Sequence, residues 1–228
     1  MATRAIIFDL DDTLYPERSY VLSGFDAVAA AFTGRLNPPF DLVRRMRQLS
    51  ESPQRRRVFN VVCAEAGVAD PEACAAEMVH AYRNHRPAIS LFPDADAALR
   101  RYRRRYRLGL ISDGYLAAQN AKLDALGIRD CFDAIILTDQ WGPEFWKPHP
   151  RAFHAVMDQF ELAPWALMYV SDNPAKDFVA PNRLGWQTVC VKRPGGVYAG
   201  ESPSAGGRPA STISTLDQLD GVLGPSAS

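Results

Sequence analysis

The strongest constraint on the fold is an alternation of short apolar segments with segments of helical periodicity, which begins near residue 91. The apolar segments have the length of buried strands and lie at 106–111, 134–137, 166–170 and 188–191. Segments with helical spacing lie at 94–105, 115–126, 150–160 and 175–184. Such alternation predicts a parallel sheet with right-handed crossovers and helices on both faces, which is a Rossmann-like, doubly wound α/β core.

Before this region the pattern is helical, apart from an apolar run at 5–8 that predicts a first buried strand. Apolar spacing and prolines predict helices at 20–35, 40–49, 55–66 and 72–82. We therefore expect an all-helical cap domain, residues 16–87, inserted into a core made of residues 1–15 and 88–228. A Gly-, Ser- and Pro-rich segment at 194–209 is expected to be a mobile loop, and 213–223 a last short strand and helix.

Composition argues against several classes of function. The formal net charge of +0 gives no bulk attraction to nucleic acid or to an anionic membrane. No apolar run approaches the ~20 residues of a membrane-spanning helix, and no basic-then-apolar leader precedes the first strand. The cysteines lack a CxxC spacing, which favours reduced thiols. We expect a cytoplasmic monomer or homodimer, and a solvated helix face rather than an RNA contact at the basic run 100–105.

The first apolar run ends in a cluster of carboxylates. Asp9, Asp11 and Asp12 occupy three of the four positions after Phe8. Like charges at the end of a buried strand are unfavourable through repulsion and desolvation, and a bound cation relieves both. Asp9 and Asp11 are two residues apart, so on an extended chain their side chains point the same way. The cluster is a candidate metal site; an acidic cap in a surface loop is the alternative.

Other polar residues follow the later strands. In an open parallel sheet, ligands bind beyond the carboxyl ends of the strands, so these positions are expected to converge. They are Ser112, Asp113 and Gly114 after the second strand, Lys147 after the third, and Asp172 with Asp177 after the fourth. Oxygen ligands suit a divalent cation, whereas hydroxyl, backbone N–H and lysine donors suit a phosphate.

Taken in order, the motifs DLDDT, SDG, a lysine before proline and DNPAKD resemble those of the haloacid dehalogenase superfamily of aspartate-nucleophile phosphatases. The resemblance covers nearly the whole chain, including the helical insertion. It implies a Mg²⁺-dependent phosphatase that acts on a small phosphorylated metabolite through an aspartyl-phosphate. By position, Asp9 is the implied nucleophile and Asp11 the general acid and base. The Asp9 carboxylate, the Asp11 backbone carbonyl and Asp172 are the implied metal ligands.

The resemblance also implies phosphate-binding roles. Ser112 and the backbone N–H groups of Asp113 and Gly114 are expected to hold phosphate oxygens, and Lys147 to neutralise charge in the transition state. Asp113 departs from the asparagine found here in many members, so only its backbone is assigned a role. Thr13 begins the exit turn in a supporting role. Asp177 is expected to orient Lys147 or a metal-bound water.

The superfamily includes reactions other than phosphate-ester hydrolysis, and the sequence bears on each of them. Attack on carbon, as in dehalogenases, does not need a carboxylate at Asp11. Phosphonate cleavage uses a cap lysine, and residues 16–87 contain none. A sugar phosphomutase stays open, with the arginines between 44 and 57 as candidates for a second phosphate, as does an idle phosphate-binding module. The substrate classes that stay open are sugar phosphates, phosphoglycolate-like acids and nucleoside monophosphates, with Tyr15, Arg18 and Tyr20 as candidate contacts.

Overall fold

The computed structural model describes residues 2–36 and 40–223. The chain divides into two compact units, one formed by Met1–Glu17 with Ser90–Ser228 and the other by Arg18–Ile89. The sequence pattern placed the corresponding boundaries at residues 15 and 87. We refer to them as the α/β unit and the helical unit.

The α/β unit is built on a six-stranded sheet in the order β3-β2-β1-β4-β5-β6. All neighbouring strands pair in parallel. The strands are β1 Ala5–Phe8, β2 Arg107–Ser112, β3 Ala134–Leu137, β4 Leu167–Ser171, β5 Gln187–Val191 and β6 Ser211–Ile213. The strand order reverses direction at β1, between β2 and β4, which is the switch point where ligands bind in open α/β sheets. The predicted fold class is confirmed.

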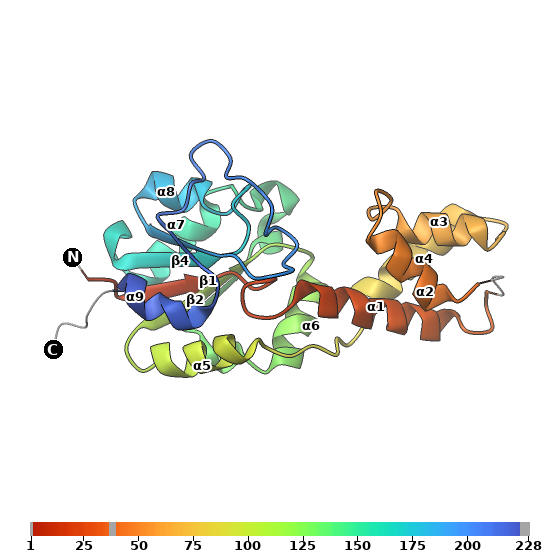
Figure 1. Ribbon diagram of the computed structural model, residues 1–228, viewed down its shortest axis with the longest axis horizontal. Coiled ribbons are helices and arrows are strands. Elements are labelled where there is room, and N and C mark those ends of the chain that lie inside the picture. Colours follow the sequence, from red (N-terminus) through yellow and green to blue (C-terminus); the bar gives the residue numbers. More distant parts are fainter. Residues whose placement is uncertain (1, 37–39, 224–228) are drawn as a thin grey trace. The chain divides into compact units, whose positions relative to one another are not determined.

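Helices cover both faces of this sheet (Figure 1). They are α5 Pro93–Tyr102, α6 Leu116–Leu126, α7 Arg151–Phe160, α8 Val179–Leu184 and α9 Leu219–Leu223, with short 3-10 turns at Arg129–Cys131, Thr138–Trp141, Pro143–Phe145, Pro164–Ala166 and Leu216–Gln218. Figure 1 shows α7 and α8 on one face, and α5 and α6 on the other. Phe153, Phe160, Tyr169 and Phe178 are among the buried side chains that join α7 to the sheet.

Helix α8 is shorter than the sequence predicted, because it begins at Val179 rather than near residue 175. The preceding residues form a turn, in which the Asn173 side chain accepts a hydrogen bond from Ala175 N at 3.0 Å. Such local bonds from asparagine compete with helix formation. The turn carries Asp177, whose N–H bonds to Asn173 O at 3.1 Å.

Two further expectations concern the surface of the α/β unit. The basic run is exposed at Arg103–Arg105, although Tyr102 within it is buried. The segment at 194–209, expected to be mobile, is hydrogen-bonded to the core: Val197 N donates to Asp12 Oδ2 at 2.7 Å, and Ser204 N to Pro174 O at 3.3 Å.

The helical unit contains α1 Glu17–Phe32 from its second residue, then α2 Leu42–Ser50, α3 Val58–Glu65 and α4 Pro71–Arg83. The aspartates before α2 and α4 cap them: Asp41 accepts from Arg44 N, and Asp70 from Ala73 N. Its interior is apolar, with Phe25, Val28, Met46, Val62 and Met78 buried together. None of the described helices could cross a membrane, and the four cysteines are free.

Candidate active site

The carboxyl end of β1 places Asp9 beside a buried lysine. Asp9 N continues the β1–β4 ladder by donating to Val170 O at 2.9 Å, which holds its backbone. Lys147 Nζ donates to Asp9 Oδ1 at 2.5 Å, and both side chains are more than nine-tenths buried. These two residues, 138 positions apart in sequence, therefore meet at the switch point of the sheet.

Two more carboxylates lie near Asp9. One carboxylate oxygen each from Asp9, Asp172 and Asp177 lie within 4.8 Å of one another, and all three side chains are buried. Burial, reinforced by the charges of Asp177 and Asp11, raises the pKa of Asp9 to about 7 against the attraction of Lys147. Burial and the charges of Asp9 and Asp177 raise the pKa of Asp172 to about 9. A single ammonium does not compensate this concentration of negative charge, so the group suits a hard divalent cation.

Lys147 has two partners besides Asp9. Its Nζ donates to Tyr169 Oη at 2.9 Å and forms an ion pair with Asp177 Oδ1 at 3.3 Å. That ion pair lacks the alignment of a hydrogen bond, since Asp177 Oδ1 has none among the described residues; Asp177 Oδ2 accepts from Ser171 Oγ. Burial opposes the charge of Lys147, but Asp177 and Asp9 outweigh it and raise its pKa well above the ordinary value. The neighbouring carboxylates therefore favour the charged form of Lys147 next to Asp9.

The Asp11 carboxylate is bound through one oxygen. Lys122 Nζ donates to Asp11 Oδ1 at 2.6 Å, and Tyr15 Oη donates to the same oxygen. Lys122, in α6, is 4% exposed. Glu17 is also near, and burial followed by the charge of Asp11 raises its pKa to about 7, while Lys122 opposes the shift. Asp11 thus has Lys122 and Tyr15 as partners of its own, while its charge still acts on Asp9.

The segment after β2 contains a glycine whose backbone conformation and close neighbours disfavour any side chain. Gly114 has φ 116°, and a Cβ there would lie 2.5 Å from Gln119 Nε2, so a larger residue would be strained. Ser112 is 1% exposed, and its hydroxyl donates to Gln119 Oε1 at 3.1 Å. The Asp113 side chain is held by other groups, as Asp113 Oδ2 accepts from Lys176 Nζ at 2.6 Å.

The bonds to Asp113 compensate the negative charge of its buried side chain. Its Oδ1 accepts from Thr138 Oγ1 at 2.8 Å and from Lys147 N at 3.1 Å. Burial raises the pKa of Asp113, but the charges of Lys147 and Lys176 and these bonds outweigh burial and lower it. The extra negative charge is therefore neutralised within the α/β unit.

The exit turn after β1 is supported by Arg193, which lies just after β5. Thr13 is fully buried, and its carbonyl oxygen accepts from Arg193 Nε at 3.2 Å and Nη2 at 2.9 Å. Asp12, at φ 50°, accepts from Glu17 N at 2.8 Å. The Thr13 hydroxyl is buried without a hydrogen-bond partner among the described residues.

Two of the possible substrate contacts, Arg18 and Tyr20, belong to the helical unit. There Arg18 forms an exposed ion pair with Glu51. The Tyr20 ring packs on Tyr82 and His85, with centroids 5.5 and 4.9 Å away. Tyr15, by contrast, lies in the α/β unit and binds Asp11.

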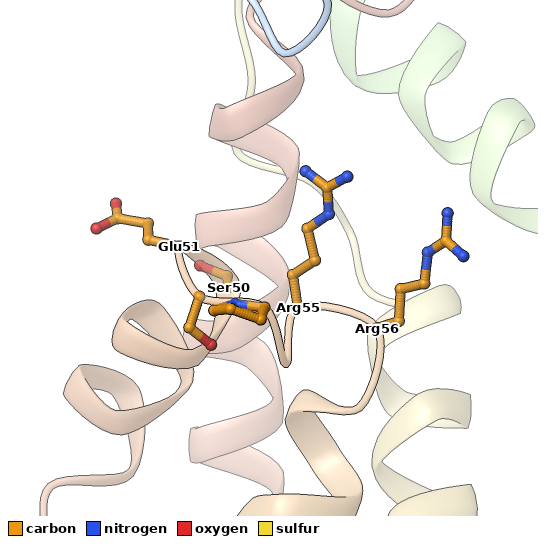
Figure 2. A pocket seen from close by; sticks show the side chains of 6 residues that line it. Ser50, Glu51, Arg55 and Arg56 are labelled. Carbon is orange, nitrogen blue, oxygen red and sulfur yellow. The ribbon is translucent and has the colours of Figure 1, made fainter.

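The helical unit has a pocket of about 570 Å³ lined by Ser50, Glu51, Ser52, Pro53, Arg55 and Arg56 (Figure 2). Figure 2 shows the side chains of Arg55 and Arg56 extending in the same direction and that of Glu51 pointing away from them. Glu51 already pairs with Arg18, and neither Arg55 nor Arg56 forms an ion pair with a described residue. The pocket therefore offers two uncompensated guanidinium groups.

Sequence reasoning missed Lys122, Tyr169, Lys176 and Thr138 as members of the site. Tyr169 lies inside β4, where alternate residues face opposite sides of the sheet, so its position gave no sign of a polar role. Lys122 could have been noticed as a lone lysine between Ala121 and Leu123 in a helix expected to pack on the sheet. Its partner, however, depends on how α6 is rotated.

The fold and the charged strand ends define an α/β enzyme with a carboxylate-based site. The family model of haloacid dehalogenase-like hydrolases matches residues 3–185, and the chain belongs to this family. The superfamily predicted from the sequence motifs is thereby confirmed, as is the prediction that the protein is a hydrolytic enzyme.

Several relatives have been named for their activities. The chain is 30% identical over 199 residues to glyceraldehyde 3-phosphate phosphatase from Methanopyrus kandleri, covering 83% of this chain and 84% of the relative. It is 35% identical over 142 residues to phosphoserine phosphatase from Thermus thermophilus, covering 62% and 55%. It is also 24% identical over 229 residues to haloacetate dehalogenase H-2 from Moraxella, covering 94% and 95%. Relatives with the higher identities are thus phosphatases.

Solved structures share the fold. A HAD-hydrolase from Bacillus subtilis, crystallised bound to magnesium, superposes with a TM-score of 0.70 at 16% identity, covering 98% of this chain and 99% of that one. A 2-haloacid dehalogenase from Pseudomonas syringae gives 0.65 at 24% identity, covering 97% and 98%. At these identities the likeness concerns the fold alone.

Proposed function

We propose that this protein is a magnesium-dependent phosphatase that hydrolyses a small phosphomonoester through an aspartyl-phosphate on Asp9. The observation that carries the proposal is the placement of Asp9, a buried carboxylate, against the ammonium group of Lys147 and beside Asp172 and Asp177. The names of two phosphatase relatives support the same reaction class.

In the first step, an Asp9 carboxylate oxygen forms a bond to phosphorus as the bond from phosphorus to the ester oxygen breaks. Asp11 gives its proton to the departing oxygen, so the alcohol leaves neutral. In the second step, water forms the new bond to phosphorus, Asp11 takes a proton from that water, and the bond from Asp9 to phosphorus breaks. Inorganic phosphate leaves and both carboxyl groups return to their starting state.

The remaining groups bind and orient the phosphoryl group. Ser112 and the N–H groups of Asp113 and Gly114 supply donors, and Lys147 supplies positive charge where negative charge spreads in a loose transition state. Asp9 and Asp172, with the Asp11 carbonyl, would hold Mg²⁺, and the buried acidic group fits such an ion. When bound, the ion supplies charge neutralisation at the phosphoryl oxygens. Asp177, through its ion pair with Lys147, keeps that lysine in position.

A screen of small phosphate esters with Mg²⁺ tests this function. It should include glyceraldehyde 3-phosphate and phosphoserine, because relatives are named for them, together with phosphoglycolate, sugar phosphates and nucleoside monophosphates. We expect release of inorganic phosphate that stops when EDTA removes the metal. Haloacetate belongs in the same screen, because release of halide without phosphatase activity would instead favour the dehalogenase reaction.

A phosphomutase is the second candidate, and the uncompensated pair Arg55 and Arg56 favours it, since a bisphosphorylated intermediate needs a second anion site. A phosphomutase transfers the phosphoryl group within the sugar, whereas a phosphatase releases it as inorganic phosphate, so the products separate the two reactions. A mutase would convert a hexose 1-phosphate into the 6-phosphate with little free phosphate, and a phosphatase would release phosphate from both. Tight binding of these esters without either reaction would indicate an idle binding module.

A further inference from the structure

One buried charge in the α/β unit has no place in the proposed chemistry. Lys122 lies in α6, is 4% exposed and is 111 positions from Asp11, yet its Nζ is 2.6 Å from Asp11 Oδ1. Burying a lysine is unfavourable unless a partner compensates its charge. A lysine at the surface of α6 would stabilise the helix equally well, so packing alone does not account for its burial.

Both hydrogen bonds to Asp11 reach the same oxygen. Lys122 Nζ and Tyr15 Oη both donate to Oδ1, whereas Oδ2 accepts no hydrogen bond within residues 2–36 and 40–223. The Tyr15 ring is fully buried, and Lys122 Nζ lies 5.9 Å from its centroid, so the two donors support each other. The carboxyl group is thus held at one oxygen and leaves the other open to a proton donor or acceptor.

We propose that Lys122 is a positioning residue for Asp11, which together with Tyr15 anchors Oδ1 so that Oδ2 exchanges protons with the leaving oxygen and the attacking water. The inference rests on the proposed function, because it presupposes that Asp11 is the general acid and base. It adds a residue outside the motifs at the strand ends. Lys147 then contacts the nucleophile Asp9, and Lys122 contacts the proton-transfer group Asp11.

The prediction concerns dependence on the leaving group. An ester with a good leaving group needs little proton donation, whereas one with a poor leaving group depends on it. 4-Nitrophenyl phosphate and phenyl phosphate have similar shapes and differ in this respect. Lys122→Met should lower kcat/KM for phenyl phosphate at least about tenfold more than for 4-nitrophenyl phosphate, a fraction of the 10²–10⁴ that general acid–base catalysis contributes.

Because both esters are assayed on one enzyme sample, any loss of folded protein cancels from this ratio. Lys122→Arg, which keeps the charge, should restore part of the phenyl phosphate activity. Lys192→Met is the matched control, since Lys192 is exposed on the same unit and should leave the ratio unchanged. Equal losses on the two esters would mean that Lys122 is merely structural, and would overturn the proposal.

A double-mutant cycle tests whether Lys122 affects catalysis through Asp11. If Lys122 acts through Asp11, adding Lys122→Met to Asp11→Asn should change kcat/KM for phenyl phosphate less than about twofold, because coupled residues are not additive. A full additional loss in the Asp11→Asn background would contradict the proposal. Failure of the proposed function looks different: the wild-type enzyme with Mg²⁺ would then hydrolyse neither ester, and the positioning role would fall with it.

Discussion

The α/β unit buries several charged side chains, whereas the helical unit keeps its ion pairs on the surface. In the α/β unit, Lys147, Lys122 and Asp9 are buried, and their partners come from distant parts of the chain. In the helical unit, the ion pairs are on the surface: Arg35 and Glu77 are each 55% exposed. The buried cluster of that unit consists of apolar residues such as Met46.

The difference indicates that the buried charges of the α/β unit serve a chemical role, whereas the apolar interior of the helical unit provides stability. Replacing a buried ion pair by apolar residues is often neutral or stabilising, so buried charges are weak evidence for a stabilising role and stronger evidence for a chemical one. The helical unit is stabilised by apolar burial, and its exposed pairs contribute little. We therefore expect substitutions of the buried charged residues of the α/β unit to affect activity, and substitutions of the exposed ion pair of Arg35 and Glu77 in the helical unit to have little effect on it.

The largest effect is expected for Asp9→Asn. This change removes the charge of the nucleophile while keeping its shape, and should reduce phosphate release at least about 10³-fold. The matched control is Asp26→Asn in the helical unit, an exposed carboxylate paired with Arg47, which should keep normal activity. Steady-state rates and circular dichroism of both variants provide the measurement. Near-normal activity of Asp9→Asn would show that the covalent mechanism is wrong.

Met46→Ala should give a clear loss of stability in the helical unit. Met46 is fully buried in the apolar cluster, and truncation of such a side chain lowers the free energy of unfolding by about 2–5 kcal/mol. Urea denaturation followed by circular dichroism measures the change. A loss below about 0.5 kcal/mol would mean that the site is far less tightly packed than its burial indicates.

The acidic group should make the metal-free protein sensitive to alkaline pH. The pKa values of Asp9 and Asp172 are raised to about 7 and about 9, above the ordinary aspartate value in an unfolded chain. Between that ordinary value and the raised ones, the folded state binds more protons than the unfolded state. Stability should therefore decrease as the pH rises towards about 9. Mg²⁺ binds the ionised carboxylates, so its stabilising effect should grow over the same interval.

Melting temperatures measured in EDTA and in Mg²⁺ across this pH range test the point, with an expected shift of several degrees. Asp172→Asn should flatten the pH dependence in EDTA and weaken the response to Mg²⁺. A metal-free protein whose melting temperature stays constant or rises with pH would contradict the assignment of the acidic group.

The smallest effect is expected for the exposed pair Arg35 and Glu77. A double-mutant cycle to alanine should give a coupling energy of about 0.2–1 kcal/mol that decreases with added salt. Urea denaturation at low and high salt measures it. A coupling above about 3 kcal/mol would place this surface pair in the range of buried ones and would remove the contrast between the units.

Much of the architecture could be predicted because the signals are local. The strand Ala5–Phe8 and the glycines after α6 and α8, at φ 65° and 82°, have the structure that their sequence indicates. Asp9, Lys147, Asp172 and Asp177 lie together, because parallel strands present their carboxyl ends at one edge. Helix α8 was predicted too long, because the turn made by Asn173 competes with a helical pattern.

The sequence by itself determined which residues stand at the ends of the strands, and hence that Asp9, Lys147 and Asp172 meet. Only the tertiary structure decided which oxygen of Asp11 is held, and by which groups. The physical reason is that a side chain's partner depends on the rotation of its helix and on the face of the sheet that the helix covers. Nothing within a few residues of Lys122 specifies that its ammonium group points at a carboxylate 111 positions away.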